Sequence, residues 1–385
     1  MAGANGTTPD ATDLVAELQA IAARPLSAAT GMPPGVYVSE DVLALEQSRI
    51  FAREWLCAGR ADAIPNTGDY LTTRIGGQPV FVIRGTDGGI RAFANVCRHR
   101  MMRLLDGSGT CRRIVCPYHA WTYRIDGQLI AAPHMERTDG FDAKQVRLPE
   151  VRSEVWEGWI FVTLDPDVAP VARRLRALKK IVGPYRMANY RQFVQRDHVW
   201  RSNWKCLTEN FMEGYHLPVA HRGTVGAYFP VKDTEFGDAA DPAFTFQWFK
   251  KTADAPVGTA HPRNKRLKGA ARQTSVLITI YPAHMIALAP DHFWYLSLQP
   301  KGTGEVEIRH GAAFAPEVLK HTKDPDGLIA ETTAFLDRVN EEDRFVVEGI
   351  YQGAQGALSQ AGPLSWLERE NHEFIQYLAR RLGDA

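Results

Sequence analysis

Two short cysteine–histidine pairs constrain this sequence more than any other feature. Both lie in the segment CRHRMMRLLDGSGTCRRIVCPYHAW, which contains Cys97 and His99 as the first pair and Cys116 and His119 as the second. Thiolates and neutral imidazoles are strong ligands for iron and zinc. Gly and Pro residues around the pairs predict loops at both places. A fold that brings the loops together would hold a metal centre.

The order of the ligands bears on which metal is bound. Zinc modules usually pair Cys with Cys and His with His, whereas each loop here offers one of each. A Rieske [2Fe–2S] cluster has two cysteines on one iron and two histidines on the other. The alternation favours this cluster, with a structural zinc ion or chance spacing as alternatives. Cys57, Cys111 and Cys206 are interpreted as ordinary core or surface thiols.

The pattern of apolar residues and turns along the chain predicts two domains, the first all-β and the second α+β. Short apolar runs with Gly-rich turns dominate from about Leu56 to Leu164, and longer helical patterns mixed with β-like runs follow. We therefore expect N-terminal helices over 1–47, a small all-β domain over 48–165 and a larger α+β domain over 166–385.

Helices are predicted near both ends of the chain. After a loose tail, Asp13–Ala23 has an amphipathic pattern, and Ser39 is a suitable N-cap for a second helix running toward Trp55. Further helical patterns cover 328–352 and 363–381.

A second metal site is predicted in NWKCLTENFMEGYHLPVAH, residues 203–221. A helix here would place Glu209, Glu213 and His216 on one face, and the turn beyond it would supply His221. A lone histidine is more often a satisfied, partly buried residue. Non-haem Fe(II) enzymes, however, use two histidines and one carboxylate on one face of the iron, and two histidines beside acidic residues suit that arrangement.

The carboxylate ligand is sought in FLDRVNEEDRFVVEGI. On a helical wheel Asp343 lies in the middle of an apolar stripe, Glu342 at its edge and Glu341 on the opposite side. A buried carboxylate is costly unless it is paired or binds a metal. Asp343 is therefore the predicted third ligand.

With both sets in this order, the chain resembles the oxygenase (α) subunit of the Rieske non-haem iron oxygenases from about Tyr37 to Gln352. The resemblance rests on CRHR, CPYHAWTY, NWK followed by EN, and ED before the last helix. It implies a Rieske [2Fe–2S] domain and a helix-grip catalytic domain of the Bet v1 or START type, on which the N-terminal helices pack. The implied cluster ligands are Cys97, His99, Cys116 and His119, and the implied ligands of mononuclear Fe(II) are His216, His221 and Asp343.

Two catalytic residues are implied by the same resemblance. Glu213 stands where the family keeps an acidic residue that bridges a cluster histidine and an iron-site histidine. In a homotrimer it would meet His119 of the next chain. Asn203 matches a family residue close to the iron, and a helix N-cap is its alternative interpretation.

The sequence departs from the family pattern at two positions. Met101 replaces the Gly that usually follows CRHR, which puts the conformation of that loop in question. Glu213 replaces the Asp of ring-dihydroxylating members and resembles enzymes of quaternary amines such as choline, glycine betaine, carnitine and stachydrine. The favoured function is O2-dependent N-demethylation of such an amine. Aromatic ring hydroxylation or O-demethylation is the alternative within the family, and an electron carrier or zinc protein is the alternative outside it.

Composition bears on the partners. A net charge of +1 favours neither nucleic acid nor an anionic membrane, and no apolar run is long enough to span a bilayer. The five cysteines and the absence of a signal-like start predict a cytoplasmic protein without disulfides. No GxGxxG fingerprint occurs. NAD(P)H would therefore act through a separate flavin and iron–sulfur reductase, with or without a ferredoxin.

A quaternary ammonium substrate would bind to aromatic faces. The second domain offers candidate rings, most of which are expected to be core residues: Phe244, Phe246, Trp248, Phe249, Tyr281, Phe293, Trp294 and Tyr295. The same lining would suit an aromatic substrate.

Overall fold

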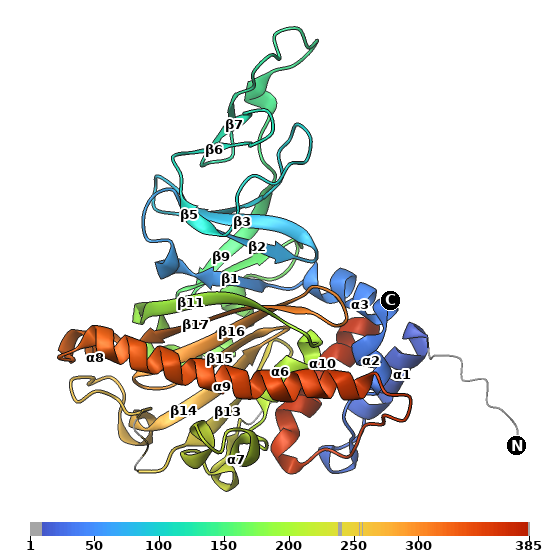
Figure 1. The fold of residues 1–385 in the computed structure, drawn as a ribbon, viewed down its shortest axis with the longest axis vertical. Coiled ribbons are helices and arrows are strands. Elements are labelled where there is room, and N and C mark those ends of the chain that lie inside the picture. Colours follow the sequence, from blue (N-terminus) through green and yellow to red (C-terminus); the bar gives the residue numbers. More distant parts are fainter. Residues whose placement is uncertain (1–9, 238–240, 254, 256, 384–385) are drawn as a thin grey trace, which may run out of the picture. The chain divides into compact units, whose positions relative to one another are not determined.

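The computed structural model divides the chain into two compact units (Figure 1). The β unit is Phe51–Ala177, and the α+β unit combines Met1–Ile50 with Leu178–Ala385. The structure describes residues 10–237, 241–253, 255 and 257–383. The predicted three-part division stays a prediction, and its first nine and last two residues lie outside the described residues.

The β unit is built on two antiparallel sheets. The larger has the strand order β1-β10-β9-β4-β3-β2-β5, and the smaller is β6-β7-β8. Aromatic and aliphatic side chains from both sheets form a buried core that also includes Cys97 and Cys116. The strands are β1 Leu56–Arg60, β2 Asp69–Ile75, β3 Gln78–Arg84, β4 Ile90–Ala94, β5 Ser108–Thr110, β6 Arg113–Val115, β7 Thr122–Arg124, β8 Leu129–Ala131, β9 Glu150–Trp156 and β10 Trp159–Thr163.

The α+β unit contains one seven-stranded antiparallel sheet in the order β11-β17-β16-β15-β14-β13-β12. Its central strands are rich in β-branched and aromatic residues, which favour strands because they pack well on a pleated surface. The strands are β11 Arg191–Trp200, β12 Glu235–Phe236, β13 Phe244–Lys250, β14 Thr274–Ile280, β15 His284–Leu288, β16 His292–Pro300 and β17 Val306–Phe314.

Helices cover this sheet, and the long helix α9 runs across its face (Figure 1). Asp324 caps the start of α9, and Ser39 caps α3 as predicted. In the described part of the chain no helix is long and apolar enough to cross a membrane. The helices of both units, of which α4 lies in the β unit and contacts β9, are α1 Ala11–Ala22, α2 Pro34–Val38, α3 Glu40–Glu46, α4 Val171–Arg174, α5 Arg176–Val182, α6 Trp204–Met212, α7 Leu217–Ala220, α8 Pro316–His321, α9 Pro325–Ala354 and α10 Arg369–Gly383.

The predicted fold class, a small all-β unit with a larger helix-grip α+β unit, is confirmed. The helix capped by Ser39 ends earlier than expected, because regular α-helix stops at Glu46 and a π-helical turn over Gln47–Phe51 follows. The three other predicted helices are present as α1, α9 and α10.

A buried polar network joins the N-terminal helices to α6. The Lys205 ammonium lies 2.6 Å from the Glu46 carboxylate, which also accepts a hydrogen bond from the Trp204 indole. The Tyr37 hydroxyl donates to Glu209 at 2.7 Å. Burial raises the pKa of Glu209 to about 7 and outweighs the opposing effects of Tyr37 and Lys205.

This pKa predicts a pH-dependent stability. Glu209 binds its proton more tightly in the folded state than in the unfolded state, so its contribution is full below about pH 4.5 and declines as pH rises through about 7. In wild-type protein the free energy of unfolding should fall by about 2 to 3 kcal/mol more between pH 5 and 7 than in Glu209→Gln. Urea unfolding followed by tryptophan fluorescence measures this difference. Parallel pH profiles for the two proteins would contradict it.

Candidate functional site

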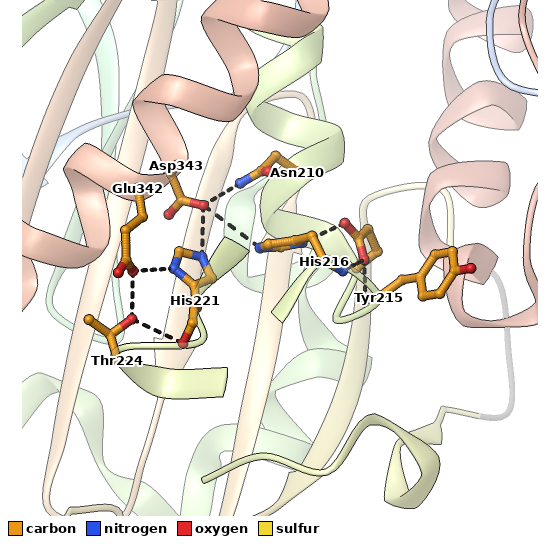
Figure 2. Close-up of polar contacts among 8 residues, drawn as sticks. Asn210, Tyr215, His216, His221, Thr224, Glu342 and Asp343 are labelled. Atoms are coloured by element: carbon orange, nitrogen blue, oxygen red, sulfur yellow. Dashed lines mark hydrogen bonds and ion pairs between the residues drawn. The ribbon is translucent and has the colours of Figure 1, made fainter. Parts of the chain in front are cut away.

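Three predicted residues from distant parts of the chain meet beside the sheet of the α+β unit. His216, His221 and Asp343 each offer one ligand atom, and these atoms lie within 4.8 Å of one another. Asp343 Oδ1 is 3.0 Å from His221 Nε2 and 3.7 Å from His216 Nε2. Asn210 donates a hydrogen bond to the same oxygen at 2.7 Å. Figure 2 shows Asp343 as the common partner of the other three side chains.

The backbone reaches this arrangement differently from our expectation. A single helix carrying Glu209, Glu213 and His216 on one face is wrong, because α6 ends at Met212 and Glu213 is extended (φ −120°, ψ 152°). The two histidines instead flank the short helix α7, which begins with proline in its first turn, where a missing N–H costs nothing. Their ring centroids are 5.0 Å apart. Glu209 therefore belongs to the buried network around α6.

Each histidine is held from behind by a carboxylate. Glu213 Oε1 lies 2.5 Å from His216 Nδ1, and Glu342 Oε2 lies 2.7 Å from His221 Nδ1. Thr224 donates a further hydrogen bond to Glu342 at 2.6 Å (Figure 2). Such contacts fix the tautomer that leaves Nε2 free for a metal. Sequence reasoning missed this role of Glu342, although its place beside Asp343 at the edge of the apolar stripe was the available signal.

The donor set fits a divalent iron. Two imidazoles and one carboxylate on one side of a common point match the two-histidine, one-carboxylate centre of non-haem Fe(II) enzymes. Asp343 and His221 are buried, 6% and 2% exposed. In the metal-free protein burial opposes protonation of His221, but Asp343 and Glu342 outweigh it and raise the pKa. Metal binding at this site is therefore expected to release a proton.

A cavity of about 130 Å³ opens beside this set, between the sheet and α9. Register places its wall residues on one face of the sheet, since Leu277 pairs with Ala287 and Ala287 with Trp294. On α9 the cavity is lined from Thr332 to Asp343 at helical spacing. Among the described residues, six aromatic side chains line it: Phe211, Phe229, Phe249, Trp294, Phe314 and Phe335.

Two of the eight predicted candidate rings, Phe249 and Trp294, are among these lining residues. Four of the other candidates are buried away from the cavity: Phe244, Tyr281, Phe293 and Tyr295. The rings that were missed lie on α6, β17, α9 and a loop, where an isolated Phe carries no distinguishing sequence signal.

Asn203 is not brought to the metal set. It is the N-cap of α6, where its side-chain oxygen accepts from the Lys205 amide. Its amide nitrogen donates to the carbonyl oxygens of Tyr37 and Thr303. The N-cap interpretation is thus what the structure shows, and a catalytic role for Asn203 stays a prediction. Asn210 is the amide that contacts Asp343.

The two cysteine–histidine loops of the β unit have the same backbone design. In the first loop the Cys97 carbonyl accepts from the Met101 amide at 3.0 Å, and the Cys97 amide donates to Met102 at 2.8 Å. In the second loop Cys116 makes the equivalent bonds with Ala120 and Trp121, at the same two distances. His99 and His119 approach each other with ring centroids 4.7 Å apart.

The two loops also share one unfavourable backbone angle. Met101 and Ala120 both have φ 56°, in the left-handed region that favours glycine. The loop conformation that Met101 put in question is therefore adopted, at the cost of placing a side chain at a position suited to Gly. The Met101 side chain avoids further strain by pointing to solvent, where it is 81% exposed.

The donors of these loops fit a [2Fe–2S] cluster. Both thiols are buried, whereas both imidazoles are exposed at the loop tips. The Cys97 sulfur is 3.3 Å from the Tyr123 hydroxyl. Burial and the neighbouring Cys97 raise the pKa of Cys116, although the Tyr118 and His119 amides act in the opposite direction. Such amides stabilise a thiolate once positive metal charge is present.

Comparison with known families agrees with both sites. A family model described as the ring hydroxylating alpha subunit (catalytic domain) matches residues 187–384, which contain His216, His221 and Asp343. A model of the Rieske [2Fe-2S] domain matches residues 54–150, which contain both cysteine–histidine loops.

Individual relatives are similar over about half of the chain. The carnitine monooxygenase oxygenase subunit of Escherichia coli (strain K12) is 33% identical over 198 residues, 50% of this chain and 52% of that protein. The glycine betaine monooxygenase oxygenase subunit of Chromohalobacter salexigens is 37% identical over 214 residues, 55% of this chain and 48% of that protein. The chain thus spans about half the length of the curated relatives it matches.

The fold itself is shared over nearly the whole chain. The crystal structure of a quaternary ammonium Rieske monooxygenase with its substrate L-carnitine superposes with a TM-score of 0.78 at 24% identity. The superposition covers 94% of this chain and 98% of that one.

The left-handed angle at Met101 predicts the effect of a substitution. Met101→Gly should stabilise the cluster loop by about 1 kcal/mol, because glycine adopts this angle without a Cβ clash. The midpoint temperature at which the cluster loses its visible absorption should rise by about 4 °C. Met102→Gly is the matched control, since Met102 has no positive φ and should lose stability. An equal shift in both variants would contradict the argument.

Proposed function

Because this chain belongs to the family of ring-hydroxylating oxygenase alpha subunits and carries a Rieske [2Fe–2S] domain, we propose that it is the terminal oxygenase of a monooxygenase system acting on methylated or quaternary amines. The observation that carries the proposal is the set of His216, His221 and Asp343, with ligand atoms within 4.8 Å of one another on the wall of an aromatic cavity. Aromatic hydroxylation or O-demethylation is the second candidate, supported by the same six rings.

In this proposal the residues of the α+β unit bind and orient Fe(II). His216 and His221 present Nε2 to the ion, and Glu213 and Glu342 hold their Nδ1 atoms. Asp343 is the third ligand, and Asn210 fixes one of its oxygens. The bound iron would supply O2 activation, and the cluster, held by Cys97, His99, Cys116 and His119, would supply electrons one at a time.

The cavity wall holds the substrate and limits access of water to the reacting carbon. The overall reaction consumes O2, two electrons and two protons, inserts one oxygen into an N-methyl C–H bond and releases the other oxygen as water. The resulting carbinolamine breaks its C–N bond to give formaldehyde and the demethylated amine. The alternative of an electron carrier or a zinc protein does not account for the set of His216, His221 and Asp343 beside such a cavity.

The electrons require partners outside the chain. We place a separate NAD(P)H-dependent reductase before the cluster, and a homotrimer in the cytoplasm as the working assembly. Glu213 already contacts His216 within one chain, and His119 is exposed at its loop tip. Glu213 would bridge these two histidines across neighbouring chains. The apolar surfaces of Met101 and Tyr118, 81% and 54% exposed, lie in the same loops as the cluster histidines and suit such a contact.

The substrate class is tested by coupled product measurements. Anaerobically reconstituted protein with a surrogate reductase should consume O2 and release equimolar formaldehyde with one of a panel of methylated amines. His216→Ala should lower turnover by at least about 100-fold while the visible spectrum of the cluster persists. If only aromatic acids stimulate O2 uptake, the function is aromatic hydroxylation or O-demethylation and not N-demethylation. Full activity of His216→Ala would contradict the metal site.

The bridging role of Glu213 is tested in a single turnover. Glu213→Gln should retain the cluster and the mononuclear iron. The rate at which the reduced protein forms product in a single turnover should nevertheless fall about 10- to 100-fold. Glu342→Gln is the matched control, because Glu342 makes the same Nδ1 contact to the other histidine. Equal single-turnover rates in the two variants would show that both carboxylates only orient their histidines.

A further inference from the structure

One ionisable side chain lines the cavity away from the metal set. His292, the first residue of β16, is on the wall together with His216, His221 and Asp343. Among the described lining residues no Lys or Arg occurs, and the other polar side chains outside the metal region are Ser275 and Thr332. An anionic group on a ligand in this cavity would therefore find one candidate cationic partner.

Asp291 orients the His292 ring. Asp291 Oδ1 lies 2.7 Å from His292 Nδ1, and Oδ2 accepts the Gly258 amide at 2.8 Å. The hydrogen bond that the His292 ring makes within the described part of the chain uses Nδ1. The other ring nitrogen, Nε2, is therefore available to a ligand. The side chains of the pair are about one-sixth exposed, at 16% for His292 and 17% for Asp291. This carboxylate–imidazole pair resembles those behind the two metal-site histidines, but His292 is not one of the three residues whose ligand atoms come together there.

Electrostatics keep Asp291 ionised beside the ring. Burial acts to raise the pKa of Asp291, yet the charge and hydrogen bond of His292 and the Gly258 amide outweigh it and hold the pKa below its usual value. The Asp291 carboxylate accepts the proton on Nδ1 and so directs Nε2 away from Asp291. Both nitrogens of an imidazolium are donors, so in that form Nε2 would donate a charge-assisted hydrogen bond to an anion.

The rest of the wall suits a group of opposite charge. Phe211 and Trp294 meet edge to face with centroids 5.3 Å apart, and Phe211 is adjacent in sequence to Asn210, the partner of Asp343. Phe229 and Phe249 form a second perpendicular pair at 6.1 Å. Perpendicular rings present faces on which a quaternary ammonium binds by cation–π attraction.

We propose that His292, held by Asp291, binds the carboxylate of a zwitterionic quaternary amine and so selects betaines over amino alcohols such as choline. The inference rests on the proposed function and names the substrate class within it. It makes His292 a specificity-determining residue that orients the substrate with its N-methyl groups toward the metal set.

Binding to the reconstituted oxidised protein tests this directly, because no turnover occurs without electrons. Isothermal titration would use glycine betaine, choline and 3,3-dimethylbutanoate, in which carbon replaces the ammonium nitrogen of glycine betaine. In His292→Gln the Kd for glycine betaine and for 3,3-dimethylbutanoate should rise about 10- to 100-fold, while the Kd for choline should change less than about twofold.

Two further variants guard against a general defect. Asp291→Asn keeps the ring but removes its charged partner, and should weaken carboxylate binding by about 10-fold without affecting choline. His198→Gln changes an exposed histidine on β11 that does not line the cavity, and should leave all three affinities unchanged.

Two negative results have different meanings. Equal affinity of wild-type protein for glycine betaine and choline, or an equal loss of all probes in His292→Gln, would overturn the assignment of His292 and leave N-demethylation intact. If no quaternary amine binds or turns over and benzoate binds in a His292-dependent manner, the proposed function falls, and with it the betaine assignment. His292 would then be the carboxylate partner of an aromatic acid.

Discussion

The buried carboxylate of Asp343 is the interaction on which the α+β unit depends. It lies on α9, 6% exposed, and faces two histidines and an amide that come from around α6 and α7. An unpaired carboxylate in that position would be strongly unfavourable. The pairing therefore ties the long helix to the segment 203–221 across more than one hundred residues of sequence. Packing of α9 on the sheet therefore also brings Asp343 to the two histidines.

The carboxylates around the histidines are chemically equivalent but differently placed. Glu342 is on α9 beside Asp343, so one turn of helix supplies both a predicted ligand and the carboxylate that holds His221. The contacts of Glu213 are with residues close to it in sequence. Its extended backbone lets Oε2 accept hydrogen bonds from the Tyr215 and His216 amides while Oε1 contacts the His216 ring. Gly214 permits this turn against the sheet, since a Cβ there would come within 2.8 Å of the Phe249 ring. The orientation of His216 thus depends on a few consecutive residues, whereas that of His221 depends on the tertiary fold.

Residue spacing identified the three residues that come together in the α+β unit, but not the backbone connections between them. The burial of Asp343 followed from helical periodicity over α9, and that part of the prediction is confirmed. The helix through Glu213 was wrong because periodicity over two turns cannot detect a change to extended backbone that is stabilised by side-chain acceptors and a close contact with the sheet. Asn210 and the Asp291–His292 pair had no signal in one sequence, because their roles depend on strand register and on a cavity formed by several strands, helices and loops.

The charge distribution of the cavity separates the two candidate substrate classes. The carboxylates of Asp343, Glu213 and Glu342 surround the two imidazoles, with Glu213 and Glu342 on the Nδ1 side of the rings. Three ionised carboxylates would outweigh the charge of one divalent ion and leave the region net negative. A cationic head group is therefore attracted to this region, and the aromatic faces of the wall add to that attraction. A protonated His292 would supply the opposite charge elsewhere on the same wall. This order of charges matches a betaine, whereas an uncharged aromatic ring would use only the apolar surface.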